Sequence, residues 1–338
     1  MRAKELRLAL VCYGGISLAV YMHGVTKEFW HLARASRAVL DNDSDSLGKV
    51  EQHYAALIAD ISQRAGTSLR ILPDIIAGAS AGGINGIFLG HALTTGLSLD
   101  PLTTLWLETA DVDTLLDPDA RPISRFTKFW ATPLVWLALK RPGNAIARTV
   151  SLDARDEVRH KLSRFVRARW FEPPFGGGVF SSLLLDAFNA MAKGPRGPKL
   201  VPPGQPLDLF VTVTDFHGHK ERLKLNSPSE ITETEHKLIV SFRDDGNTRN
   251  ELDDAIALTF AARATASFPG AFPPFSVTEL DKVVSARAMA WPGRDSFLAR
   301  TLPHKDAAQA VLIDGSVLAN APFKPAIAAL RDRPARRE

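Results

Sequence analysis

The stretch Ile75-Ile76-Ala77-Gly78-Ala79-Ser80-Ala81-Gly82-Gly83 decides how this chain of 338 residues folds. An apolar run leads into the pattern Gly-x-Ser-x-Gly, and small and apolar residues continue beyond it. The apolar run is typical of a buried strand, and the residues after Ser80 are compatible with a helix. Because glycine has no Cβ, Gly78 and Gly82 allow the strand and the helix to approach each other closely. The pattern therefore predicts a strand, a sharp turn with Ser80 at its apex, and a helix.

This arrangement is typical of a nucleophile elbow, in which a strained turn exposes the hydroxyl group of a serine. The free N–H groups and the positive dipole end of the following helix face the place where an oxyanion would form. A glycine-rich turn that only permits tight packing would produce the same pattern, because only three of its five positions are fixed. Both interpretations require a strand over residues 71–77 and a helix over residues 81–93.

The composition is that of a globular protein without a dominant charge. Hydrophobic residues make up 45% of the chain, charged residues 23%, and the net charge is +4. This charge argues against a dedicated nucleic-acid-binding protein and permits an anionic membrane surface or substrate. Cys12 is the only cysteine, so no internal disulfide can form, and a cytoplasmic setting fits. Its place in an apolar segment predicts a buried, unreactive thiol.

The sequence contains no recognisable signal peptide, and its longest uncharged apolar stretch is too short to cross a bilayer. That stretch belongs to the segment 125–141, where Trp130, Trp136 and several leucines stand between Arg and Lys residues. This pattern suits a contact with a membrane surface. A helix that packs its aromatic side chains inward explains the pattern equally well. We therefore expect a cytoplasmic protein, with peripheral membrane contact through this segment as one alternative.

The order of predicted elements indicates an α/β architecture. A strand over residues 5–12 precedes helices over residues 17–35 and 49–65, and the strand and helix around Ser80 follow. This alternation is typical of a parallel sheet covered by helices. We expect a single domain over residues 1–338.

The second half of the chain is less regular before strands return. Pro/Gly-rich connections separate short helical pieces, which predicts a helical insertion at about 101–204. After it we expect the following: strands over 207–216 and 238–242 joined by a turn at 217–220, a helix over 252–266, a short strand over 311–313 and a helix over 325–330. The chain stops soon after, which is compatible with a fragment of a longer protein.

A serine hydroxyl becomes a good nucleophile when a neighbouring base accepts its proton. One possible base is the histidine of a Ser–His–acid triad. No histidine follows Asp314, so a triad would combine Asp215 or Asp254 with His236 or His304.

The other possible base is a single carboxylate, in a Ser–Asp dyad. Asp314 ends a short apolar strand and is followed by Gly315. The carboxyl ends of strands in an open parallel sheet converge on one crevice, so Asp314 and Ser80 can meet there. An ordinary turn also explains Asp-Gly.

The loop after the first strand offers donors for an oxyanion, because Gly14, Gly15 and Ile16 present backbone N–H groups with little side-chain obstruction. A tight turn would need the same glycines. They do not form Gly-x-Gly-x-x-Gly, which disfavours dinucleotide binding. The sequence has no Walker A pattern and no metal-spaced cluster of His, Cys and Asp, so we expect no cofactor.

Taken together, these motifs resemble the patatin-like phospholipase family, and in particular its bacterial patatin-related branch. The resemblance covers residues 5–100 and 205–330. It is carried by Gly78-Ala79-Ser80-Ala81-Gly82, Asp314-Gly315-Ser316, Asn320-Ala321-Pro322, and residues 211–215 and 263–274. The first loop departs from the family pattern Gly-Gly-Gly-x-Arg/Lys-Gly, because its third glycine and its basic residue are missing.

The resemblance implies a three-layer α/β/α fold with a mostly parallel central sheet. It also implies phospholipase A-type hydrolysis of lipid esters, and hence lipid degradation, through an acyl-enzyme. Ser80 would attack, Asp314 would accept its proton, and Gly14, Gly15 and Ile16 would hold the oxyanion, with no metal or cofactor. The partner would be a lipid or phospholipid substrate and not a nucleic acid. A soluble esterase, thioesterase or acyltransferase and a catalytically idle or partner-dependent scaffold are the alternatives.

Overall fold

The computed structural model describes residues 2–15, 18–43, 47–109, 173, 175–224, 226–227, 229–303, 306–331 and 333 of the chain. Several sequence predictions concern residues outside these ranges: Ile16, His304, the segment 125–141 and most of the expected insertion.

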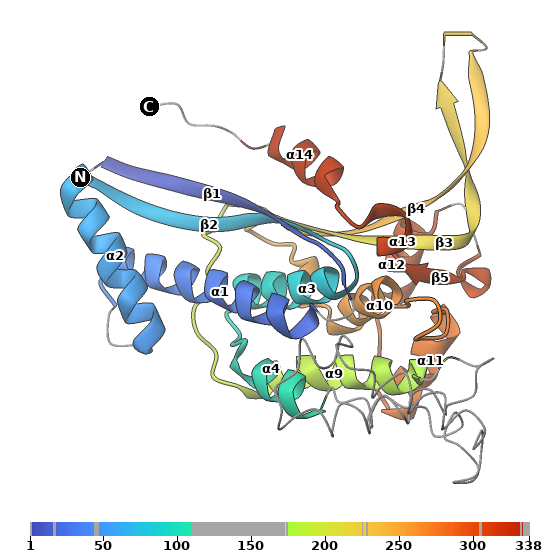
Figure 1. Cartoon of the computed structure of the whole chain (residues 1–338), viewed down its shortest axis with the longest axis horizontal. Helices are drawn as coiled ribbons and strands as arrows, with labels where there is room; N and C mark the ends of the chain where they lie inside the picture. Colours follow the sequence, from blue (N-terminus) through green and yellow to red (C-terminus); the bar gives the residue numbers. More distant parts are fainter. Residues whose placement is uncertain are drawn as a thin grey trace, which may run out of the picture.

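A mixed sheet forms the centre of the described chain (Figure 1). Strands β1 (Arg2–Cys12), β2 (Thr67–Gly78) and β3 (Leu207–Lys224) lie side by side in this order and run parallel. Strands β4 (Glu230–Asp244) and β5 (Leu312–Asp314) both pair antiparallel with β3. The prediction of an α/β fold, with a sheet of mostly parallel strands flanked by helices, is confirmed.

Helices cover both faces of the sheet (Figure 1). Helices α1 (Ala19–Asp41), α3 (Ser80–Thr95) and α10 (Ala255–Thr265) lie on one face, and α14 (Phe323–Arg331) lies on the other. Farther from the sheet, α9 (Gly177–Lys193) packs against α10. The remaining helical elements are α2 (Lys49–Ala65), α4 (Asp100–Thr104), a π-helical turn (Leu105–Thr109), α11 (Val277–Ala286), α12 (Arg294–Thr301), α13 (Ser316–Ala319) and two 3-10 turns (Glu251–Asp253 and Ala307–Gln309).

Helix α3 lies at the centre of the hydrophobic core. Every residue from Ala81 to Thr95 is buried, so this helix has no solvent-facing side, as expected for a helix that is apolar all round. Phe88 of α3 packs against Phe188 of α9, with ring centroids 5.0 Å apart. The segment that forms α9, which the sequence assigned to the insertion, is therefore part of the main core. Cys12 is buried as predicted, and burial raises the pKa of its thiol to about 11.

The turn predicted at residues 217–220 is wrong. Strand β3 continues to Lys224, and β4 begins at Glu230, so the two strands form a long hairpin that projects from the body of the molecule (Figure 1). Gly218 has a φ of 72°, and the pairing register shifts between Thr214 and His219. The glycine therefore accommodates an irregularity within the ladder and does not end the strand.

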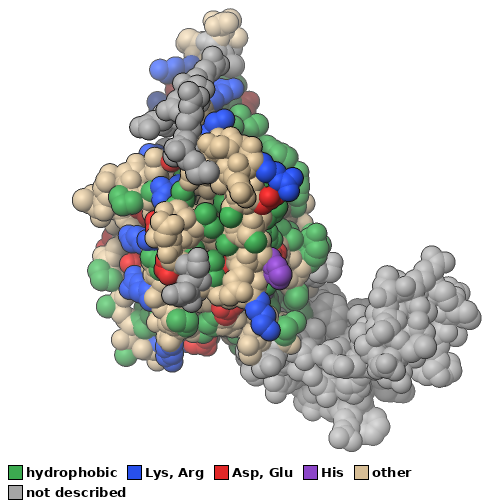
Figure 2. Space-filling model, turned by 90° about the vertical axis from the view of Figure 1, so that its left-hand side faces the viewer, with side chains coloured by type: hydrophobic (Ala, Val, Ile, Leu, Met, Phe, Trp, Pro, Cys, Tyr) green, Lys and Arg blue, Asp and Glu red, His purple; other side chains and the backbone are tan. Residues whose placement is uncertain are grey.

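The face of the molecule that carries α2 shows no single dominant charge (Figure 2). On the side that carries α2, basic and acidic side chains are interspersed among apolar ones (Figure 2), in keeping with the small net charge. Within the described ranges, none of the helices has the length and the apolar character that a membrane span requires.

Candidate active site

Ser80 lies at the apex of the turn between β2 and α3, as the Gly-x-Ser-x-Gly pattern predicts. Strand β2 ends at Gly78 and α3 begins at Ser80, whose φ is 52°. This left-handed conformation is uncommon outside glycine and is costly for a residue with a Cβ. A Cβ at Gly82 would overlap the carbonyl oxygens of Cys12 and Tyr13. Glycine at this position therefore lets the end of β1 lie directly against the first turn of α3.

Asp314 meets Ser80 at this turn. The Ser80 hydroxyl donates a hydrogen bond to Asp314 Oδ2 over 2.7 Å. Gly78, the last residue of β2, pairs with Val211 of β3, and Asp314, the last residue of β5, pairs with Val213. Because β2 and β5 run along β3 from opposite directions, their carboxyl ends face each other. The two residues are together as expected, but the expected reason, two parallel strand ends, is wrong.

The carboxylate of Asp314 is buried and held on several sides. Its Oδ1 accepts the backbone N–H of Ser316 at 2.7 Å, and its own N–H donates to the carbonyl of Ser267 at 3.1 Å. Burial raises the pKa of this carboxyl, and the hydrogen bonds from Ser80 and Ser316 oppose that effect. A carboxylate with a raised pKa is a stronger base than one in water, which suits proton transfer from a hydroxyl group. Gly315, the next residue, is buried beside the backbone of β3.

The glycine loop lies beside the serine. A Cβ at Gly14 would lie only 2.6 Å from the Cβ of Ser80 and 2.9 Å from Asn320 Oδ1. The Gly14 N–H already donates to Asn320 Oδ1 over 2.7 Å. Gly15 follows in the loop, while the third predicted donor, Ile16, lies outside the described residues. Asn320 was not among the predicted site residues, and its only signal in the sequence is the Asn-x-Pro pattern.

Thr265, the last residue of α10, is a second side chain of the site that sequence reasoning missed. Its Oγ1 accepts the backbone N–H of Ser80 at 2.8 Å and donates to the carbonyl of Thr212 at 2.7 Å. Its position in the segment 263–274, part of the resemblance described above, is the signal that could have indicated it.

Two of the residues considered for a triad, Asp254 and His236, have other partners. Asp254 Oδ1 accepts the N–H groups of Ile256 and Ala257 and so caps α10, and its Oδ2 accepts the indole N–H of Trp291. His236 Nδ1 is bonded to the backbone oxygen of Asp215. Of the histidines that the structure describes, none hydrogen-bonds to Ser80 or Asp314. Within the described residues, Asp314 is the titratable side chain that hydrogen-bonds to the Ser80 hydroxyl.

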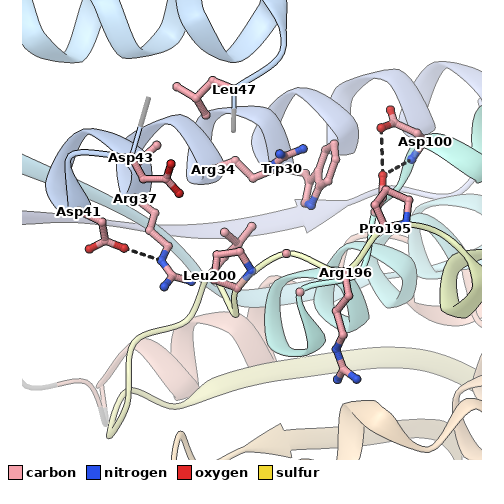
Figure 3. A pocket seen from close by; sticks show the side chains of 15 residues that line it. Trp30, Arg34, Arg37, Asp41, Asp43, Leu47, Asp100, Pro195, Arg196 and Leu200 are labelled. Atoms are coloured by element: carbon pink, nitrogen blue, oxygen red, sulfur yellow. Dashed lines mark hydrogen bonds and ion pairs between the residues drawn. The ribbon is translucent and has the colours of Figure 1, made fainter. Parts of the chain in front are cut away.

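The cavity in Figure 3 is separate from this site. It has a volume of about 280 Å³ and lies between α1 and the segment 195–200. Its arginines are engaged locally, since Arg37 bonds to Asp41, Arg34 to Glu51 and Arg196 to the carbonyl of Thr95. In the described part of the chain, no group of three or more His, Cys, Asp or Glu side chains is arranged to hold a metal ion.

Comparisons with known proteins place the chain in a family. The chain is 27% identical over 349 residues to the uncharacterized membrane protein Rv3479 of Mycobacterium tuberculosis, and the alignment covers 99% of this chain. It covers 26% of that protein, so the chain spans about a quarter of the length of this relative. The profile of patatin-like phospholipases matches residues 10–327, which include the elbow, the glycine loop and Asp314. The chain belongs to the patatin-like phospholipase family.

Proposed function

We propose that the protein hydrolyses carboxylic ester bonds of lipids, with Ser80 as nucleophile and Asp314 as general base. The observation that carries this proposal is the 2.7 Å hydrogen bond from Ser80 Oγ to the buried Asp314 carboxylate, at a turn where Ser80 has a φ of 52°. Membership of the patatin-like phospholipase family supports lipid acyl hydrolysis in general. Phospholipase A-type cleavage is the specific form that we propose.

In the first step, Ser80 Oγ attacks the ester carbonyl carbon while its proton moves to Asp314. The oxyanion would be held by N–H groups of the loop at Gly14, Gly15 and Ile16 and of the first turn of α3, where free N–H groups and the helix dipole favour negative charge. Collapse of the intermediate breaks the ester C–O bond, and the departing alcohol takes the proton from Asp314. In the second step, Asp314 takes a proton from a water molecule, whose oxygen attacks the acyl carbonyl carbon. The bond between that carbon and Ser80 Oγ then breaks, Ser80 recovers the proton from Asp314, and the fatty acid is released.

Exposed apolar side chains next to the dyad support a lipid substrate presented at a surface. Tyr13, which precedes Gly14, is 43% exposed and makes an edge contact with Phe323, which is 48% exposed. Val317 and Leu318, just beyond Asp314, are 46% and 45% exposed. Aromatic and aliphatic side chains of this kind suit the boundary between lipid headgroups and acyl chains. We propose that this rim, together with the segment 125–141, forms a peripheral membrane contact.

The experiment is to measure fatty-acid release from phospholipid vesicles by the wild type, Ser80→Ala and Asp314→Asn. We expect the wild type to release fatty acid and both variants to release it at least about 10³-fold more slowly. Thermal melting checks that both variants are folded. Full activity in either folded variant would contradict the proposal. Phospholipids labelled in one acyl chain identify the bond that is cleaved. A preference for short-chain esters or acyl-CoA over vesicles would favour the soluble esterase, thioesterase or acyltransferase.

The membrane contact has its own test, co-sedimentation of the protein with anionic vesicles. We expect Tyr13→Ser and the double variant Trp130→Ala/Trp136→Ala to reduce binding. Binding equal to that of the wild type in both would contradict the proposed contact.

One observation favours a second candidate function, an idle or partner-dependent scaffold. The Gly14 N–H is already bonded to Asn320 Oδ1 and is not directed to a substrate in this arrangement. Folded wild-type protein that is inactive on vesicles, soluble esters and acyl-CoA would support this candidate.

A further inference from the structure

One short segment, residues 263–267, holds the backbone of both members of the dyad. Thr265 Oγ1 accepts the N–H of Ser80, and the carbonyl of Ser267 accepts the N–H of Asp314. We propose that this segment is a positioning element, in which the hydroxyl group of Thr265 holds Ser80 in the conformation that aims its Oγ at Asp314. The inference rests on the proposed function, in which Ser80 is the nucleophile.

The Thr265 side chain is fixed by hydrogen bonds and by packing. It is fully buried, and its hydroxyl bridges the elbow and β3 by accepting from Ser80 and donating to the carbonyl of Thr212. Its methyl group lies against α3, because a Cβ at Gly83 would be 3.0 Å from Thr265 Cγ2. Because the carbonyl of Thr212 holds the hydroxyl and α3 contacts the methyl group, the acceptor oxygen has a well-defined position.

Ser80 needs an acceptor at this position. The first N–H groups of a helix have no partner within the helix, and a polar side chain at the N-cap normally accepts one of them. The N-cap of α3 is Ala79, which makes no side-chain hydrogen bond. Thr265 supplies the acceptor from another helix, directly at the residue whose φ is 52°. Without the Thr265 hydroxyl, the Ser80 N–H would lose this acceptor at the residue with the strained backbone.

Arg263 anchors the segment. Its guanidinium group is fully buried and pairs with Glu279 of α11 through Nε (2.9 Å) and Nη2 (3.1 Å). The same group donates to Ser267 Oγ at 2.5 Å and to the carbonyl of Pro273 at 3.0 Å. It therefore holds the chain on both sides of the point where Ser267 contacts Asp314. This anchoring role accounts for the buried guanidinium group of Arg263 near the end of α10.

The test compares Thr265→Val, which keeps the shape and loses the hydroxyl, with Thr265→Ser, which keeps the hydroxyl and loses the methyl group. The measurements are the second-order rate of reaction with a fluorophosphonate, hydrogen exchange of a peptide that includes the Ser80 amide, and thermal stability. We expect Thr265→Val to react at least about tenfold more slowly, as expected for misplacement of the reacting atom by a fraction of an ångström. Its peptide should exchange faster. Thr265→Ser should remain within about threefold of the wild type in both measurements, even where packing loss lowers its melting temperature.

The matched control is Thr259→Val. Thr259 is also buried in α10, but its hydroxyl donates to the carbonyl of Ala255 within the helix and does not reach the dyad. This variant should react at the wild-type rate. If Thr265→Val does not fold, Thr265→Ala and Thr265→Ser differ by the single oxygen atom and give the same comparison.

Two outcomes separate this inference from the proposed function. A folded Thr265→Val protein with wild-type reactivity and wild-type exchange at Ser80 would overturn the inference while the function stands. The second outcome combines two results. The wild type does not react with the fluorophosphonate, but the peptide that includes the Ser80 amide exchanges slowly in the wild type and in Thr265→Ser and fast in Thr265→Val. This outcome would overturn the proposed function and support the positioning of Ser80.

Discussion

Replacing Gly14 with alanine should displace the glycine loop from Ser80 without altering either member of the dyad. A Cβ at this position would lie 2.6 Å from Ser80 Cβ, 2.9 Å from Asn320 Oδ1 and 3.0 Å from the carbonyl oxygen of Ala79. Carbon atoms in contact are normally about 3.5–4.0 Å apart, so the loop must move by roughly 1 Å. A displacement of that size costs about 10²-fold in rate when it misplaces a catalytic group. Overpacking of this kind also destabilises a fold by about 1–3 kcal/mol.

The assay is kcat/KM for a soluble ester together with thermal unfolding, and Gly24→Ala is the matched control. Gly24 is an exposed position inside α1, where an added Cβ would meet nothing within 4 Å. Alanine there should stabilise the protein by about 1 kcal/mol and leave the rate unchanged. A folded Gly14→Ala protein that hydrolyses the ester at the wild-type rate would refute the assignment of this loop to the site.

Two further predictions concern buried charges. Glu279→Gln removes the carboxylate that pairs with the fully buried Arg263, so we expect a loss of about 3–5 kcal/mol in chemical denaturation, and a loss under 1 kcal/mol would contradict this role. Because burial raises the pKa of Asp314, the native state binds a proton more readily than the unfolded state does. The stability that this proton contributes is fully present below the unfolded-state pKa and is lost as the pH rises through the raised, folded-state value. Asp314→Asn has no carboxyl proton to lose, so it should avoid this loss of stability. Its melting temperature should exceed that of the wild type at neutral pH, and its activity should be abolished. Calorimetry across acidic and neutral pH checks the sign, and a variant less stable than the wild type at neutral pH would contradict it.

Local sequence patterns predicted the elements that depend on local chemistry. The helix expected over residues 49–65 matches α2, which Gly66 ends with a φ of 61°. The turn at Ser80 follows from the glycines around it, whose missing side chains are needed at a close approach of backbones. Both features are encoded within a few residues of where they appear.

Features that depend on long-range packing were not predictable in this way. The direction of β5 is set by its pairing with β3, about 100 residues earlier, and three apolar residues before an Asp-Gly do not encode it. Thr265 and Asn320 contact the site over separations of 185 and 306 residues, and neither residue type is distinctive as a site residue. The long hairpin was not predicted because a glycine between polar residues, such as Gly218, normally indicates a turn. Here it lies at an irregularity in the pairing of β3 with β4.

The most direct test of the activation of Ser80 by Asp314 is labelling with a fluorophosphonate, followed by mass spectrometry of the peptide that contains Ser80. We predict a single adduct on Ser80 in the wild type, no adduct in Ser80→Ala and a much slower reaction in Asp314→Asn. An adduct on a different residue, or no adduct on the folded wild type, would contradict the claim that Asp314 activates Ser80 as a nucleophile.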